Sequence, residues 1–227
     1  MSPYRTEAKL VNEFKTSYAD IFLKQIHSGP MRRFVLLEEF DCYNGVADIV
    51  LAVFRPYVRL QRTRPSVNHN WLLPLSRLPG NKVISLQEYV SLYGVTCRMA
   101  RKHFENFINA SFVVSLEDNT YRVTKTYTPI LDTTVSIEAK LHDWKRALGQ
   151  AYRYKRFSNY SFVLLPKDSA VSAIQNIDLF IKYNVGLVTL GKQGLTIHHR
   201  PLRINSQSND AFLRVNESAY KRFTSAA

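Results

Sequence analysis

The second half of the chain alternates between strand-like and helix-like segments, and this pattern restricts the possible folds more than any other feature of the sequence. After Pro129, short apolar runs typical of β-strands are separated by longer segments whose apolar residues recur at three- and four-residue steps, as in amphipathic helices. Such alternation is characteristic of α/β proteins. The expected order is strand 133–139, helix 143–157, strand 160–165, helix 169–183 and strand 186–190.

Further elements are expected on either side of this core. Residues 7–23 have the periodicity of an amphipathic helix, and two apolar runs follow at 33–40 and 46–54. An Asn-Gly step between these runs favours a hairpin, so we expect an antiparallel strand pair. A last strand is expected at 195–199, and the polar residues from Asn205 onward are expected to end, at most, in a short helix.

The region between the strand pair and the α/β core has a different character. From 55 to 82 the periodicity fades, and four prolines accompany an arginine-rich stretch. Residues 84–124 then have the pattern of a helix, a turn at Gly94, a second helix and a hairpin, which predicts a self-contained subdomain. We therefore expect a discontinuous core, 1–54 and 129–227, interrupted by a linker and this insertion (55–128, with the subdomain at about 84–124).

The chain carries a strong excess of positive charge. Its 227 residues include 31 Lys and Arg against 18 Asp and Glu, which gives a formal net charge of +13 and a pI of about 9.8. Such a balance attracts polyanions, so nucleic acid is the first partner to consider, and a basic protein without such a partner is the alternative.

No signal for export or membrane insertion is visible. Residues 1–20 carry charges throughout and lack the apolar stretch of a signal peptide, and no window reaches membrane-spanning length. The two cysteines, Cys42 and Cys97, form no CxxC motif and no Cys/His cluster, so we expect reduced thiols. These features predict a cytoplasmic, intracellular protein.

Three charged residues are candidates for chemistry. Asp48 is the single acid in an apolar strand, where an unpaired carboxylate would be costly, so we expect it to face a metal, a charged partner or a wet cleft. In the strand that ends at Ala139, period-2 alternation places Glu138 and Lys140 on one face. The two carboxylates could hold Mg²⁺, and the lysine could position or deprotonate an attacking water. The alternative is a surface ion pair beside an aspartate that caps a turn.

The segment after this strand adds a second motif. A helix is expected to follow, and it places Gln150 and Tyr154 one turn apart on one face. In this combination the chain resembles the PD-(D/E)XK nuclease superfamily, in particular the members with a QxxxY motif after the ExK strand. Ala47 stands where the family name has proline.

The resemblance implies a restriction-endonuclease-like mixed sheet flanked by helices, with Asp48, Glu138, Lys140, Gln150 and Tyr154 in the catalytic centre. It also implies that Asp48, Glu138 and the carbonyl of Ala139 ligate Mg²⁺, with Mn²⁺ as a substitute, and that the first helix donates a further acid. Glu13 is the best candidate for that acid, and Glu7 and Glu39 compete with it.

The insertion resembles a winged helix-turn-helix, although Pro74 leaves its first helix undefined in the sequence. A basic second helix and a hairpin could contact the phosphates or the major groove of duplex DNA, and a protein-docking role is the alternative. The core helix after the ExK strand carries further cations that could follow a nucleic-acid backbone. The candidate nucleic-acid contacts are Arg98, Arg101, Lys102, His103, Arg122, Lys145, Arg146 and Arg153.

Taken together, these features predict a divalent-metal-dependent DNA endonuclease whose insertion binds duplex DNA. A non-catalytic DNA-binding protein on a nuclease-like fold and an RNA-directed nuclease are the alternatives. A homodimer would suit double-strand cleavage, but no feature of the sequence supports one.

Overall fold

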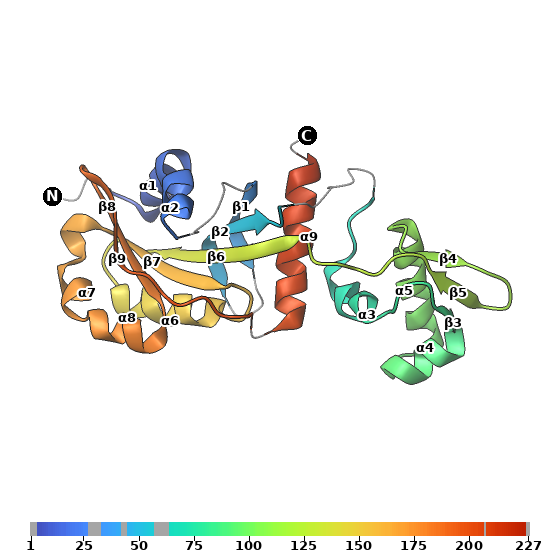
Figure 1. Ribbon diagram of the computed structural model, residues 1–227. Coiled ribbons are helices and arrows are strands. Elements are labelled where there is room, and N and C mark those ends of the chain that lie inside the picture. The colour runs from blue at the N-terminus through green and yellow to red at the C-terminus, as the bar shows by residue number, and fades with distance from the viewer. Residues whose placement is uncertain (1–3, 27–32, 42–44, 57–63, 207, 226–227) are drawn as a thin grey trace. The chain divides into compact units, whose positions relative to one another are not determined.

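The computed structural model describes residues 4–26, 33–41, 45–56, 64–206 and 208–225. The chain folds as two compact units (Figure 1). Unit 1 consists of Met1–Tyr57 and Leu131–Phe212, and unit 2 consists of Val58–Ile130 and Leu213–Ala227. Unlike the division expected from the sequence, residues from Leu213 onward therefore group with the inserted region.

Unit 1 is built on a mixed six-stranded sheet with the order β1-β2-β6-β7-β8-β9. Strands β6, β7 and β8 pair in parallel because helices connect them, whereas the β1–β2, β2–β6 and β8–β9 pairs are antiparallel. This confirms the expected α/β class with a mixed sheet flanked by helices. The strands are β1 (Phe34–Asp41), β2 (Val46–Phe54), β6 (Leu131–Ala139), β7 (Tyr160–Pro166), β8 (Gly186–Gly191) and β9 (Gly194–His199).

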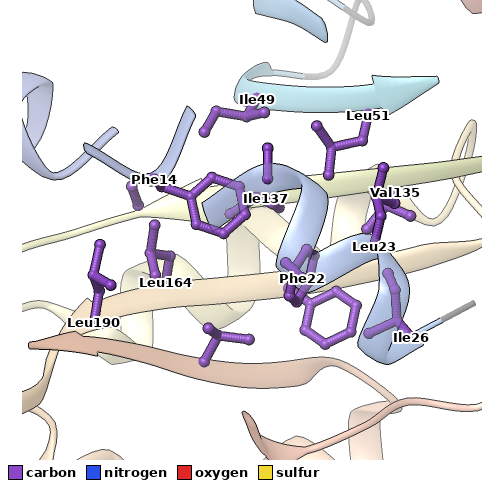
Figure 2. Close-up of a cluster of buried hydrophobic side chains, with 14 of the residues drawn as sticks. Phe14, Phe22, Leu23, Ile26, Ile49, Leu51, Val135, Ile137, Leu164 and Leu190 are labelled. Carbon is purple, nitrogen blue, oxygen red and sulfur yellow. The ribbon is translucent and has the colours of Figure 1, made fainter. Parts of the chain in front are cut away.

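A continuous helical stretch at the N-terminus covers one face of the sheet. It comprises α1 (Glu7–Glu13), a π-helical turn (Phe14–Tyr18) and α2 (Ala19–Ile26). Figure 2 shows its apolar residues, among them Phe14 and Phe22, against side chains from the strands. The strand residues in this cluster include Ile49, Leu51, Val135, Ile137, Leu164 and Leu190.

The opposite face is covered by α6 (Trp144–Tyr154), α7 (Val171–Gln175) and α8 (Ile177–Tyr183). Their apolar residues pack on Val163 and Leu165, which alternate along β7 with Leu164 on the first face. The single helix expected at 169–183 is wrong, because a short 3₁₀ turn precedes α7 and the backbone leaves the helical region at Asn176. Glycine is required at Gly186, since a Cβ atom there would lie 2.1 Å from the Phe162 ring.

Unit 2 contains a small antiparallel sheet with the order β3-β5-β4 and a helical layer. The side chains of Ser85 and Thr96 cap the starts of α4 and α5, and Gly94 adopts the left-handed conformation (φ +60°) that ends α4. Pro74 lies in the first turn of α3, where no backbone N–H donor is needed. The elements are α3 (Leu72–Ser76), β3 (Val83–Ser85), α4 (Leu86–Tyr93), α5 (Cys97–Asn109), β4 (Val113–Ser115) and β5 (Thr120–Val123).

The C-terminal region is more regular than expected. Instead of a polar tail with at most a short helix, α9 (Asn209–Ser225) forms a 17-residue helix. Within unit 2, the buried carboxylate of Glu217 accepts hydrogen bonds from both terminal nitrogens of Arg64, each at 2.8 Å. This buried pair explains why residues from 213 onward belong to unit 2. Among the described helices, none is both long enough and apolar enough to cross a membrane.

Two expectations lie outside the described residues. The Asn44 position of the Asn-Gly turn and Cys42 both fall in the undescribed segment 42–44. Cys97, the other cysteine, is exposed and forms no disulfide.

Candidate functional site

Asp48 and Glu138 lie side by side on the face of the sheet that α6 covers. In the β2–β6 ladder Ile49 pairs with Ile137, so the next position places Asp48 opposite Glu138. Ile49 and Ile137 point into the cluster on the other face, and alternation along each strand therefore directs both carboxylates toward α6. Two acids that are 90 positions apart in the sequence thus become neighbours.

Asp48 is held by the neighbouring strand. Its Oδ2 atom accepts a hydrogen bond of 2.7 Å from the backbone N–H of Ala139. Burial raises the pKa of Asp48 above its ordinary value of 3.8, although the hydrogen bond from Ala139 and the charge of Lys140 oppose this shift. The backbone therefore fixes one carboxylate oxygen of Asp48, and ionisation of Asp48 is unfavourable when no cation is bound beside it.

Glu138 is 1% exposed and is oriented by Tyr154 of α6. The Tyr154 hydroxyl lies 2.6 Å from Glu138 Oε2 and also 2.6 Å from the carbonyl oxygen of Val46. Burial raises the pKa of Glu138, the Tyr154 hydrogen bond opposes this, and the negative charge of Asp48 adds to the increase. Two ionised carboxylates side by side favour the arrival of a cation.

The ammonium group of Lys140 lies among three oxygens. Its Nζ atom is 3.1 Å from Glu138 Oε1, 3.1 Å from the carbonyl oxygen of Ala139 and 3.2 Å from Glu7 Oε2. Burial works against the charged amine, but the attraction of Glu138, with smaller contributions from Asp48 and Glu7, raises the pKa of Lys140 overall. The carboxylates of Glu138 and Glu7 and the carbonyl of Ala139 therefore already surround a positive charge.

This oxygen set fits a hard divalent cation. Mg²⁺ prefers oxygen ligands, binds one or two carboxylates in proteins and keeps several waters. Asp48, Glu138 and the Ala139 carbonyl could supply such oxygens, next to the positively charged ammonium group of Lys140. Within the described part of the chain, no three Asp, Glu, His or Cys side chains form a metal-binding group by themselves. A metal here would therefore rely on the backbone carbonyl and on water in addition to side chains.

Glu7, rather than Glu13, is the acid of the first helix that reaches this site. Glu7 is the first residue of α1, and its carboxylate contacts Lys140. Glu13 instead accepts a hydrogen bond from Tyr4, whose pKa is raised by burial and by this contact. Glu39, on β1, has an unusual φ of +46°, and its negative charge helps to raise the pKa of Asp48.

Gln150 lies one helical turn before Tyr154 on α6. Its Oε1 atom is buried, and no donor within the described residues satisfies it. A buried polar atom without a partner is costly, so a water or a bound ligand is expected to complete it.

The cations proposed to contact nucleic acid are distributed over both units. Arg98, Arg101 and Lys102 are exposed on α5 of unit 2, and Arg122 is exposed on β5. In unit 1, the exposed cations on α6 are Lys145, Arg146 and Arg153.

The expectation that His103 joins the exposed cations is wrong. Its side chain is 4% exposed, and its Nδ1 atom lies 2.8 Å from the Tyr89 hydroxyl in the core of unit 2. Burial lowers the pKa of His103, which favours the neutral ring. His103 sits one turn from Phe107 on the buried face of α5 and therefore has a structural role.

Replacing Asp48 with asparagine is expected to stabilise the metal-free protein at neutral pH. Because the folded-state pKa of Asp48 is raised, the folded protein binds more protons than the unfolded chain, and stability falls as the pH rises from about 3.8 through the higher folded value. The asparagine side chain would keep an oxygen for the Ala139 N–H without the charge. Thermal melts in EDTA should show a higher midpoint for Asp48→Asn at pH 7.5, by a few degrees, and no difference at pH 3. A lower midpoint at pH 7.5 would contradict this account of the site.

Comparisons of the chain with models of protein families, with curated proteins and with solved structures found no match.

Proposed function

We propose that the protein is a divalent-metal-dependent nuclease that hydrolyses phosphodiester bonds in DNA. The observation that carries the proposal is the group of oxygens from Glu138, the Ala139 carbonyl and Glu7 around the Lys140 ammonium, with the Asp48 carboxylate beside Glu138. Oxygens that can ligate a hard cation, next to a lysine that can orient a water molecule, suit the attack of water on a phosphodiester.

The arrangement of unit 1 supports membership of the PD-(D/E)XK superfamily. Asp48 lies on the strand next to the one that carries Glu138 and Lys140, within a mixed sheet flanked by helices. Tyr154, from the QxxxY motif, touches Glu138, and Gln150 has a buried amide oxygen on the same side of α6. These contacts agree with a restriction-endonuclease-like fold, which is part of the proposal.

Each residue has a distinct role in the proposed reaction. Asp48, Glu138, the Ala139 carbonyl and, by its contact with Lys140, Glu7 would hold Mg²⁺ or Mn²⁺ together with waters. The bound metal would supply a more acidic water and stabilise negative charge on the phosphate. Lys140, as an ammonium, would orient the attacking water and the phosphate through hydrogen bonds that it donates, and Tyr154 would keep Glu138 in place.

Unit 2 is proposed to be a winged helix that binds duplex DNA. Its element order, α3-β3-α4-α5-β4-β5, and its sheet order, β3-β5-β4, suit that fold, with β4 and β5 as the wing. The exposed Arg98, Arg101 and Lys102 on α5 would enter the major groove or meet phosphates, and Arg122 and the neighbouring Lys125 lie at the wing.

Incubation of the purified protein with supercoiled plasmid and with labelled linear duplex, in Mg²⁺, Mn²⁺ or EDTA, tests the proposed activity. We expect cleavage with either metal and none in EDTA. DNA binding without cleavage under all conditions would favour a non-catalytic DNA-binding protein. Cleavage confined to RNA would favour an RNA-directed nuclease.

Substitution of Arg98, Arg101 and Lys102 by glutamine should weaken duplex binding. Each phosphate that the variant no longer neutralises should reduce the slope of log K against log salt by about 0.9. Anisotropy titrations of a labelled duplex in EDTA at several salt concentrations measure this slope. A control variant that removes three other exposed cations, Lys182, Lys221 and Arg222, should keep it. Equal slopes in both variants would point to a protein-docking role for α5.

A further inference from the structure

A lysine follows each of the three parallel strands of unit 1 directly. Strands β6, β7 and β8 end at Ala139, Pro166 and Gly191, and the next residues are Lys140, Lys167 and Lys192. Because the strands are parallel and adjacent, all three lysines lie at the same edge of the sheet. The carboxyl edge of parallel strands is where open α/β sheets bind ligands.

The row begins at the proposed catalytic centre. The register places Lys140 level with Leu165 and Thr189, so Lys167 and Lys192 lie two and three residues further along the strand direction. With strands about 4.8 Å apart and about 3.3 Å per residue, their backbones lie roughly 8 and 14 Å from that of Lys140. A nucleic-acid strand carries one phosphate per about 3.4 Å of duplex axis. Lys167 and Lys192 are therefore placed to meet phosphates of the same strand that lie to one side of the phosphate at Lys140.

Local packing holds Lys167 over the end of β8. A Cβ atom built on Gly191 would lie 3.0 Å from Lys167 Cβ and 3.3 Å from its Cδ, so the lysine stem lies across this glycine. Its Nζ atom donates a hydrogen bond of 2.8 Å to Gln193 Oε1. Gln193 and Lys192 form the turn between Gly191 and Gly194, so the two lysines belong to one surface.

An aromatic side chain borders the same turn. A Cβ atom on Gly194 would lie 3.7 Å from Tyr18 Cε1 and 3.9 Å from its hydroxyl oxygen. Tyr18 ends the π-helical turn of the N-terminal helical stretch and is partly exposed. It places a hydroxyl donor beside the lysines.

Charge along this edge becomes more positive from β1 toward β8. On β1, the exposed acids Glu39 and Asp41 continue the negative charge of Asp48 and Glu138. On the β7–β8 side the exposed charged residues are Lys167, Lys192 and one acid, Asp168. Within the described part of the chain no salt bridge joins Asp168 to either lysine. Arg153 of α6 lies beside Gly45 at the β1–β2 turn, so a polyanion meets both signs of charge at the β1 end and mainly positive charge at the β8 end.

We propose that Lys167 and Lys192, with Tyr18 beside them, bind the DNA backbone to one side of the phosphate that is cleaved, so that the strand runs from the catalytic centre across β7 and β8. This inference rests on the proposed nuclease function and adds to it the side of the site on which the substrate strand lies. The two lysines bind phosphates and take no part in bond cleavage.

A charge-matched pair of double variants tests the proposal. Lys167→Gln/Lys192→Gln removes two cations from the carboxyl edge, and Lys24→Gln/Lys182→Gln removes two exposed cations from the opposite edge. Lys24 lies in the last turn of α2, whose final carbonyls contact Arg200 after β9, and Lys182 lies in the last turn of α8 before β8 begins. Thermal melts establish that both variants fold.

Binding is measured in EDTA by anisotropy of a labelled duplex, and cleavage is measured separately in Mg²⁺. We expect the carboxyl-edge variant to lose about 1.8 from the slope of log K against log salt, since each phosphate contributes about 0.9. Its KM should rise severalfold while kcat at saturating DNA is retained. The control variant should match the wild type in both assays.

Unchanged binding by the carboxyl-edge variant, or an equal loss in the control variant, would overturn the inference. A fall in kcat with unchanged KM would overturn it as well, because the lysines would then act in the chemical step. Failure of the wild type to cleave DNA would count against the nuclease function, and the EDTA titration would still decide whether this edge binds DNA.

Discussion

Lys140→Ala should abolish metal-dependent cleavage, lowering the rate by about 10²- to 10⁴-fold, the range expected for loss of a group that transfers or positions a proton. Affinity for Mn²⁺ should be retained or increased. In the protein alone, the Lys140 ammonium occupies the position among Glu138 Oε1, Ala139 O and Glu7 Oε2, so its removal relieves competition with an incoming cation.

This combination distinguishes Lys140 from the proposed metal ligands. Glu138→Gln should lose both Mn²⁺ affinity and cleavage, whereas Lys140→Ala should lose cleavage alone. Calorimetric titration with Mn²⁺ and single-turnover cleavage of labelled duplex measure the two properties. Lys24→Ala, which removes an exposed lysine from the other end of the N-terminal helical stretch, is the control and should behave as the wild type. Full activity in Lys140→Ala would exclude the proposed catalytic centre.

Glu217→Ala should destabilise unit 2 by about 3–5 kcal/mol, the cost of leaving a buried charge without its partner. Glu217 is 1% exposed and accepts hydrogen bonds from both terminal nitrogens of Arg64, from the Val67 N–H at 2.7 Å and from the Tyr127 hydroxyl at 3.1 Å. The Arg64 guanidinium also stacks 3.9 Å from the centre of the Tyr220 ring. Alanine in place of Glu217 would leave this cation without its carboxylate partner, and the Val67 N–H and the Tyr127 hydroxyl would lose this acceptor.

Hydrogen exchange of the whole protein measures this loss locally. Amides of α4 and α5 should exchange faster in Glu217→Ala, while those of β6 and β7 in unit 1 serve as an internal reference. Glu88→Ala removes an exposed partner of Lys82 in the same unit and should cause no measurable change, because surface ion pairs contribute little. Glu217→Gln, which keeps an oxygen for Val67, should lie between the wild type and the alanine variant. Equal protection in Glu217→Ala and Glu88→Ala would show that the buried pair does not hold unit 2 together.

The core of unit 1 could be predicted because its signals are local. Alternating strand and helix patterns predicted the α/β class, and period-2 alternation predicted that Glu138 and Lys140 share a face. The meeting of Asp48 with Glu138 depends on the β2–β6 register, which no local pattern encodes. The sequence likewise could not predict whether Glu7 or Glu13 contacts Lys140. Both acids lie on one helix, and the placement of that helix on the sheet decides between them.

Long-range partners explain the remaining differences. The length of α9 could not be predicted because its buried face includes Asn216 and Glu217, two polar residues that interrupt the apolar pattern. Their partners, Ile130 and Arg64, lie 86 and 153 positions away. His103 looked like a basic contact beside Lys102, yet the phase of α5 turns it toward Tyr89.

The buried Arg64–Glu217 pair has a consequence for the order in which the protein is completed on the ribosome. Arg64 and the whole of α3 to β5 are synthesised well before Glu217, which lies 153 positions after Arg64. Domains generally fold as units during synthesis, but unit 2 lacks the carboxylate partner of its partly buried Arg64 guanidinium until α9 has emerged. Emergence of α9, rather than synthesis of residues 58–130, should therefore be the event after which unit 2 reaches its final stability. A nascent chain stalled before residue 209 should display unit 2 in a looser, protease-sensitive state.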